Sequence, residues 1–78
     1  MKIQVKLHAQ LRKLATKKSG NPITFDVADG SRVRDVIAMV GIPAKKAKLI
    51  IVNGLRGKPG DKLTDGAVID LFPPLAGG

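Results

Sequence analysis

Residues 23–43, ITFDVADGSRVRDVIAMVGIP, decide the fold, because the spacing of their apolar side chains changes part-way along the stretch. Over residues 23–27 apolar and polar side chains alternate, which predicts a half-buried strand that ends at the turn Asp29-Gly30. Over residues 33–40 the apolar side chains instead follow the helical spacing i, i+3, i+4 and i+7. They are Val33, Val36, Ile37 and Val40. The stretch therefore predicts a strand followed by a helix with one face in the core.

Both ends of this helix carry typical signals. Ser31 belongs to the residue types that cap helix N-termini, so we expect it to be the N-cap. Gly41 is expected to end the helix, and Pro43 to prevent its resumption. Because the residues of the apolar face are β-branched and form helices weakly, we expect this helix to depend on packing against a sheet.

The sequence before this stretch predicts another strand and a short helix. Residues 2–9 alternate strictly between apolar and polar side chains, which indicates a half-buried strand. Residues 10–18 change to a helical spacing, and the sequence SGNP at residues 19–22 is expected to stop the helix.

The sequence after it predicts three strands. The apolar run at residues 49–52 is typical of a strand covered on both faces or nearly so. Asn53-Gly54 is a strong type I′ hairpin signal, so a short strand is expected around Leu55-Arg56. The last strand is expected over residues 67–72, with Phe72 on the opposite face from its neighbour Leu71.

The predicted order is strand, short helix, strand, helix, strand, short strand, strand. This order indicates one α+β domain with a mixed sheet around one main helix. It fits a five-stranded ubiquitin-like β-grasp with a short helix after the first strand, although the pattern alone leaves a ferredoxin-like topology open. A chain of 78 residues leaves no room for a second domain.

The net charge and the aromatic content indicate which class of partner the chain binds. Fourteen Lys and Arg face six Asp and no Glu, which gives a formal net charge of +8. The basic residues are spread over several segments, and the only aromatic side chains of the Phe, Trp and Tyr class are Phe25 and Phe72. Stacking platforms for single-stranded nucleic acid are therefore missing. The charge indicates a solvated surface or an acidic protein partner rather than nucleic acid.

The composition also limits the chemistry. Without cysteine there is no disulfide, thiolate nucleophile or Cys-based zinc site, which fits the reducing cytoplasm. No apolar run reaches membrane-spanning length and the N-terminus has no targeting pattern, so we expect a cytoplasmic protein without a membrane partner. His8 has no acidic partner at a motif spacing and is interpreted as an exposed strand residue. The Asp spacing predicts no acid–base pair and no metal site, so the chain is not expected to be an enzyme.

The final six residues, Pro73-Pro74-Leu75-Ala76-Gly77-Gly78, are predicted to form an extended tail after a domain of residues 1–72. Two prolines remove two backbone donors and favour an extended conformation, which pushes the chain off the sheet. Six extended residues reach roughly 20 Å. The glycines lack a Cβ, so they can pass a narrow channel and let an attacking group approach the terminal carboxylate.

The sequence resembles the MoaD/ThiS sulfur carriers over essentially its whole length, and most closely the small subunit of molybdopterin synthase. The segments that carry this resemblance are Ala9-Gln10-Leu11-Arg12-Lys13-Leu14, Val52-Asn53-Gly54, Asp65-Gly66 and Phe72-Pro73-Pro74-Leu75-Ala76-Gly77-Gly78. The C-terminal segment is the specific signal among them.

The resemblance implies a carrier mechanism. A MoeB-type, E1-like adenylyltransferase would use ATP and Mg²⁺ to form an acyl-adenylate at Gly78, and a sulfur donor would then displace AMP to leave a thiocarboxylate. The tail, including Gly77, would next enter a MoaE-type large subunit and give its sulfur to a pterin precursor. The chain itself would bind no cofactor and supply only reach and recognition.

The resemblance also implies a docking surface for both partners. Its expected residues are Phe72, Pro73, Pro74, Leu75, Ala76, Arg12, Leu55 and Arg56. Arg56 departs from the family pattern, in which the corresponding hairpin position is often apolar, and the basic charge departs from the commonly acidic relatives. Both departures bear on which partner the carrier serves.

Three alternative functions would also use the C-terminal tail or would explain the basic charge. Thiamine-pathway carriers usually join the first two strands by a tight turn, and the helical spacing at residues 10–18 favours the molybdopterin type instead. A carrier for tRNA thiolation would explain the basic surface. A covalent modifier joined through Gly78 to target lysines would have the same tail chemistry.

Overall fold

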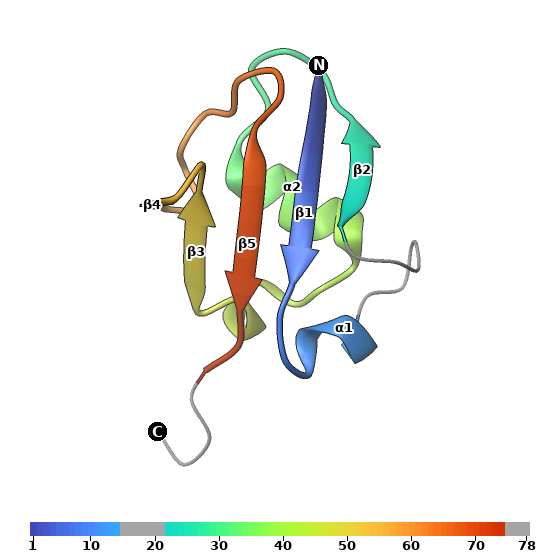
Figure 1. Cartoon of the computed structure of the whole chain (residues 1–78), viewed down its shortest axis with the longest axis vertical. Helices are drawn as coiled ribbons and strands as arrows, with labels where there is room; N and C mark the ends of the chain where they lie inside the picture. The colour runs from blue at the N-terminus through green and yellow to red at the C-terminus, as the bar shows by residue number, and fades with distance from the viewer. Residues whose placement is uncertain (15–21, 75–78) are drawn as a thin grey trace.

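The strands form one sheet in the order β2-β1-β5-β3-β4, and helix α2 crosses one of its faces (Figure 1). The computed structural model describes residues 1–14 and 22–74. The elements are β1 (Lys2–Leu7), α1 (Leu11–Leu14), β2 (Ile23–Asp26), α2 (Val33–Val40), the 3₁₀ helix η1 (Ala44–Lys46), β3 (Leu49–Val52), β4 (Leu55–Arg56) and β5 (Val68–Phe72). Residues 15–18 of the helix expected at residues 10–18 lie outside the described residues.

The first and last strands lie together at the centre of the sheet. β1 pairs parallel with β5, and the other three pairings, β1 with β2, β3 with β5 and β3 with β4, are antiparallel. One main helix over a mixed sheet with this strand order is the ubiquitin-like β-grasp, so the predicted α+β fold is confirmed.

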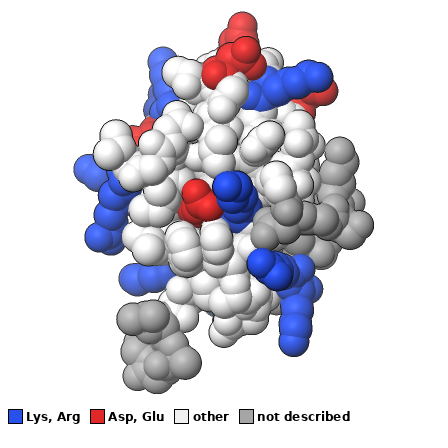
Figure 2. Space-filling view, viewed as in Figure 1, with Lys and Arg blue, Asp and Glu red and all other residues white. Residues whose placement is uncertain are grey.

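The face of the sheet that α2 does not cover is open to solvent (Figure 2). The expectation that β3 is covered on both faces or nearly so is wrong. Ile50 is buried, but Leu49, Ile51 and Val52 are only half-buried. Helix α2 covers one face of the sheet and no second layer of described residues covers the other. A continuous apolar run is therefore not explained here by burial within the chain.

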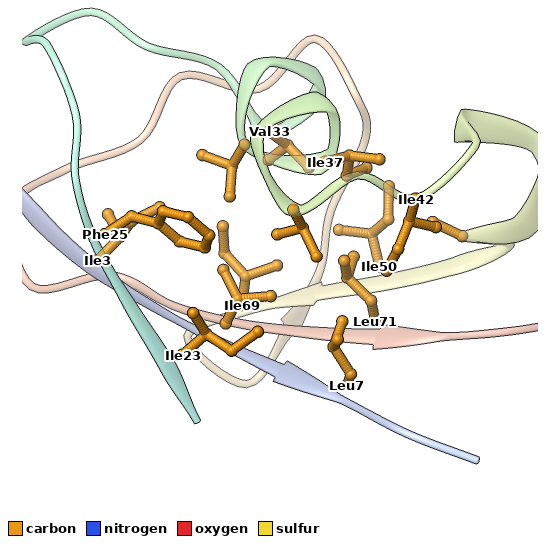
Figure 3. Packing of buried hydrophobic residues seen from close by; sticks show 14 of the residues in the cluster. Ile3, Leu7, Ile23, Phe25, Val33, Ile37, Ile42, Ile50, Ile69 and Leu71 are labelled. Carbon is orange, nitrogen blue, oxygen red and sulfur yellow. The ribbon is translucent and has the colours of Figure 1, made fainter. Parts of the chain in front are cut away.

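The core lies between α2 and the covered face of the sheet (Figure 3). Every second residue of β1 is buried, as its alternation predicted. The buried side chains of the strands include Ile3, Val5, Leu7, Ile23, Phe25, Ile50, Ile69 and Leu71, and those of α2 are Val33, Val36, Ile37 and Val40. The apolar spacing of the sequence thus identified both sides of the core correctly.

The cap of α2 differs from the prediction. Arg32, not Ser31, is the N-cap residue, and the Asp35 carboxylate accepts a hydrogen bond of 2.8 Å from the Arg32 backbone N–H. The Ser31 hydroxyl instead donates to the Ala28 carbonyl at 2.7 Å, so it stabilises the preceding turn. At the other end Gly41 adopts φ 89° and ends the helix as expected.

The hairpin between β3 and β4 has the predicted conformation. Asn53 and Gly54 have φ values of 51° and 82°, and a type I′ turn requires positive φ at both positions. The Asn53 side chain also accepts a hydrogen bond of 2.9 Å from the Val68 backbone N–H, which ties the turn to the beginning of β5.

No helix within the described parts of the chain is long and apolar enough to span a bilayer.

We predict that Ile69→Ala lowers the free energy of unfolding by about 2–5 kcal/mol, because Ile69 is fully buried in the central strand and a cavity would remain. Urea unfolding measures this loss. Val68→Ala, on the half-buried face of the same strand, should cost about 1 kcal/mol or less. Equal losses for the two variants would contradict the described packing.

Candidate functional site

The chain leaves the sheet at the end away from the N-terminus (Figure 1). β5 ends at Phe72, whose carbonyl accepts a hydrogen bond of 2.9 Å from the Lys48 backbone N–H. Pro73 and Pro74 follow outside the sheet and are half-buried. A proline cannot donate to the strand ladder, so regular pairing of this strand stops here.

An apolar groove lies at this point, which we call the exit groove. It has a volume of about 490 Å³ and is lined by Gln10, Lys48, Leu49, Arg56, Phe72, Pro73 and Pro74. Leu49 lies opposite Phe72 in the antiparallel pairing of β3 with β5, so the two side chains share one face. Lys48 and Arg56 are exposed. The groove therefore combines an apolar floor with two cations.

Phe72 is held in place by His8. The two rings are stacked, with centroids 4.1 Å apart and an angle of 8° between their planes. The His8 Nε2 atom lies 2.9 Å from Asp70 Oδ1 in a hydrogen bond. Asp70 thus orients the imidazole, and the imidazole supports one side of the Phe72 ring.

The interpretation of His8 as an exposed strand residue is wrong, because His8 follows β1 and its ring stacks on Phe72. Its side chain is 33% exposed, and its partner Asp70 comes from the other central strand. Leu7 lies opposite Leu71 in the parallel pairing, and the His8 N–H donates to the Leu71 carbonyl at 3.1 Å. Only this register brings the two side chains together, so spacing along the chain could not have found them.

The structure brings together some of the predicted docking residues. Phe72, Pro73, Pro74 and Arg56 all line the exit groove, whereas Arg12 and Leu55 do not. The Arg12 Nε donates to the Leu7 carbonyl at 3.2 Å. Leu55 is 73% exposed on the edge strand β4. Leu75, Ala76, Gly77 and Gly78 lie outside the described residues.

Three lining residues of the groove were not predicted as docking residues from the sequence: Gln10, Lys48 and Leu49. Successive side chains of a strand point to opposite faces, so Leu49 and the buried Ile50 lie on different faces of the sheet, and an alignment of β3 with β5 would have set Leu49 beside Phe72. Within residues 1–14 and 22–74, no three His, Cys, Asp or Glu side chains gather into a possible metal site. The geometry of the groove suits the binding of a protein surface.

Comparison with known proteins identifies the family. The model of a family described as Mut7-C ubiquitin matches residues 1–76. The chain belongs to the Mut7-C ubiquitin family. No curated protein sequence matches it significantly.

Three solved structures are similar to this Mut7-C ubiquitin protein over 95% or more of its length. A Pyrococcus furiosus protein provisionally named molybdopterin converting factor, subunit 1, is 28% identical, with a TM-score of 0.73 over 95% of this chain and 98% of that chain. SAMP1 from Haloferax volcanii is 27% identical, with a TM-score of 0.75 and full coverage of both chains. The Haloferax volcanii HVO 2177 protein shares the fold at 22% identity, with a TM-score of 0.78 over 100% of this chain and 87% of that chain.

These comparisons confirm that this is a small ubiquitin-like protein similar to the MoaD type and to SAMP1.

We predict that His8 and Phe72 stabilise each other. A double-mutant cycle with His8→Ala and Phe72→Ala should give a coupling of about 0.5–1.5 kcal/mol in the free energy of unfolding, because the stacked rings lose their contact in either variant. Thermal or urea unfolding of the four proteins measures it.

The control cycle pairs His8→Ala with Leu55→Ala. These positions are separated by three strand spacings, roughly 14 Å, so their effects should add. Additive effects in the His8 and Phe72 cycle would contradict the stacked arrangement.

Proposed function

We propose that this protein is a sulfur carrier whose Gly78 carboxylate is adenylated, converted to a thiocarboxylate, and used to donate sulfur in the biosynthesis of molybdopterin. One observation carries the proposal. The central strand β5 ends beside an apolar groove and is followed at once by Pro73-Pro74-Leu75-Ala76-Gly77-Gly78, the C-terminal segment on which the MoaD resemblance depends. The similarity to the Pyrococcus furiosus protein supports the pathway.

The proposed chemistry explains why a carrier needs activation. A carboxylate is a poor electrophile until one of its oxygens becomes a good leaving group. A MoeB-type adenylyltransferase uses ATP and Mg²⁺, and the Gly78 carboxylate attacks the α-phosphorus of ATP with release of pyrophosphate. Nucleophilic sulfur from the donor then attacks the acyl carbon, and AMP leaves. The resulting thiocarboxylate is a soft, ionised nucleophile for the pterin precursor bound by a MoaE-type large subunit.

The role of this chain in the proposal is reach and recognition. The exit groove is lined by Phe72, Pro73 and Pro74, so in this proposal a partner that takes up the tail also contacts the groove. A partly exposed aromatic side chain beside an apolar groove is typical of an interface hot spot. The stacked His8 restricts the Phe72 ring in the free protein, which lowers the entropy lost on docking.

A second candidate is a covalent protein modifier, which the ubiquitin-like family assignment favours. The same acyl-adenylate would then end in an amide bond to a lysine amine of a target protein. Thiamine and tRNA thiolation are alternative destinations for the sulfur, and the tail chemistry is the same in each.

We predict that the cognate adenylyltransferase, ATP, Mg²⁺ and a sulfide source convert the full-length protein to a C-terminal thiocarboxylate. Intact mass spectrometry should show one oxygen replaced by sulfur. Removal of Gly78 should abolish the product without changing the melting temperature, because the β-grasp ends at Phe72. A truncated protein that still accepts sulfur would refute the proposal.

The matched control is Met39→Ala, which changes an exposed apolar residue of α2 outside the exit groove and should leave thiocarboxylate formation intact. The sulfur destination is tested next. Transfer to the pterin precursor in the presence of the large subunit supports the molybdopterin pathway. Isopeptide adducts on cellular proteins, without sulfur transfer, would support the modifier instead.

A further inference from the structure

The charges of the described residues are separated along the long axis of the molecule. Five of the six Asp residues lie around the beginning of β1 and the beginning of α2: Asp26, Asp29, Asp35, Asp61 and Asp65. Several are held there by short contacts, such as the hydrogen bond of 2.8 Å that Asp65 accepts from the Lys2 backbone N–H. Basic residues also occur at this end, so its charges largely balance.

The end at which β5 stops is different. Its described cations come from α1, from η1 and from the margin of the exit groove: Arg12, Lys13, Lys45, Lys46, Lys48 and Arg56. None of these six forms an ion pair with a carboxylate of the described residues. Figure 2 shows basic side chains around the margins of the open face, and one basic and one acidic side chain side by side near its centre.

Asp70 is the remaining carboxylate and does not neutralise this end. It lies within the sheet, opposite Lys6 in the parallel register, and accepts the hydrogen bond from His8. The end at which the tail leaves therefore carries most of the excess positive charge of the described chain.

We propose that the exit groove docks on an acidic surface of the adenylyltransferase that receives the tail. Carboxylates of this partner pair with Lys48 and Arg56, and an apolar partner side chain occupies the floor formed by Leu49, Phe72 and Pro74. The inference rests on the proposed function and adds the chemistry of the partner surface to it.

Charge complementarity is the argument for a carboxylate-rich partner. Opposite charges steer the encounter over about a Debye length, roughly 8 Å at physiological salt, before the apolar surfaces meet. A faster association with the partner matters for a carrier, because a carrier must bind and leave successive enzymes. The same six cations would repel a basic partner, so they also select between possible partners.

The groove fits a protein better than a nucleic acid. Its floor is apolar, and the two lining cations, Lys48 and Arg56, come from different segments. Phe72 already stacks on His8, and Phe25 is buried in the core. No described aromatic ring of the Phe, Tyr or Trp class is therefore left to form a platform for successive bases.

The test uses a pair of charge-reversal variants with the same change in net charge. Lys48→Glu with Arg56→Glu alters the exit groove, and Lys58→Glu with Lys62→Glu alters exposed positions near the opposite end. The readout is the KM for the carrier in ATP–pyrophosphate exchange by the adenylyltransferase, at several NaCl concentrations. Melting temperatures of both variants confirm folding.

We expect the groove variant to raise KM about tenfold or more, with little change in kcat, because reversal replaces two attractions by two repulsions. The control variant should change KM less than about threefold. Added salt should raise KM for the wild type and lower it for the groove variant, since screening weakens attraction and repulsion alike. Loss of structure would not produce this opposite salt dependence.

The remaining outcomes are distinguishable. Equal effects of the two variants, or none from the groove variant, would overturn the acidic docking surface while the proposed function stands. Absence of exchange with the wild type at every salt concentration would overturn the proposed function and this inference with it. If only the groove variant loses binding to total tRNA, measured by fluorescence anisotropy, and its KM is unchanged, the surface serves nucleic acid and the proposal is wrong.

Discussion

The parallel pairing of β1 with β5 is the constraint on which the rest of the structure depends. It joins the first strand to the last, places Val5 opposite Ile69, and buries both completely at the centre of the core. Forming this pair closes the longest loop in the domain, so the chain between the two strands must fold around it. Helix α2, whose β-branched face has low intrinsic helix propensity, becomes stable by packing on the surface that this pair creates.

The same pairing sets the geometry of the site. Because β1 and β5 run in the same direction, the residues that follow Leu7 and Leu71 meet at one end of the sheet. His8 therefore reaches Phe72 and Asp70, although nearly the whole chain separates them in sequence. The direction of β5 also places Pro73 and Pro74 at the end of the sheet away from most of the Asp side chains. The parallel pairing of β1 with β5 thus determines the position of the Phe72 ring, the position of the exit groove and the uneven distribution of charge between the two ends of the molecule.

The periodic features of the fold could be predicted from the sequence, and features that depend on register could not. The spacing of Val33, Val36, Ile37 and Val40 identified the buried helix face, and Asn53-Gly54 identified the hairpin, because both signals are local. Ser31 was a locally reasonable N-cap, but the Asp35 carboxylate fixes the helix start one residue later. The contacts of His8 and the position of Leu49 in the groove arise between strands distant in sequence, so no local pattern contains them.

The residues that stabilise the fold are different from the exposed cations around the exit groove, and this difference has a consequence for function. The fold is stabilised by apolar burial, and the exposed cations around the exit groove form no ion pairs with described carboxylates, so they contribute little to folding. Positions of this kind can change sign without loss of the β-grasp, and selection on them acts mainly through binding. A Mut7-C ubiquitin protein can therefore keep one tail chemistry and one groove while the surrounding charge matches a particular partner. The stability of the domain does not require the basic end of this chain, and the proposed acidic docking surface would give that end a role in recognition.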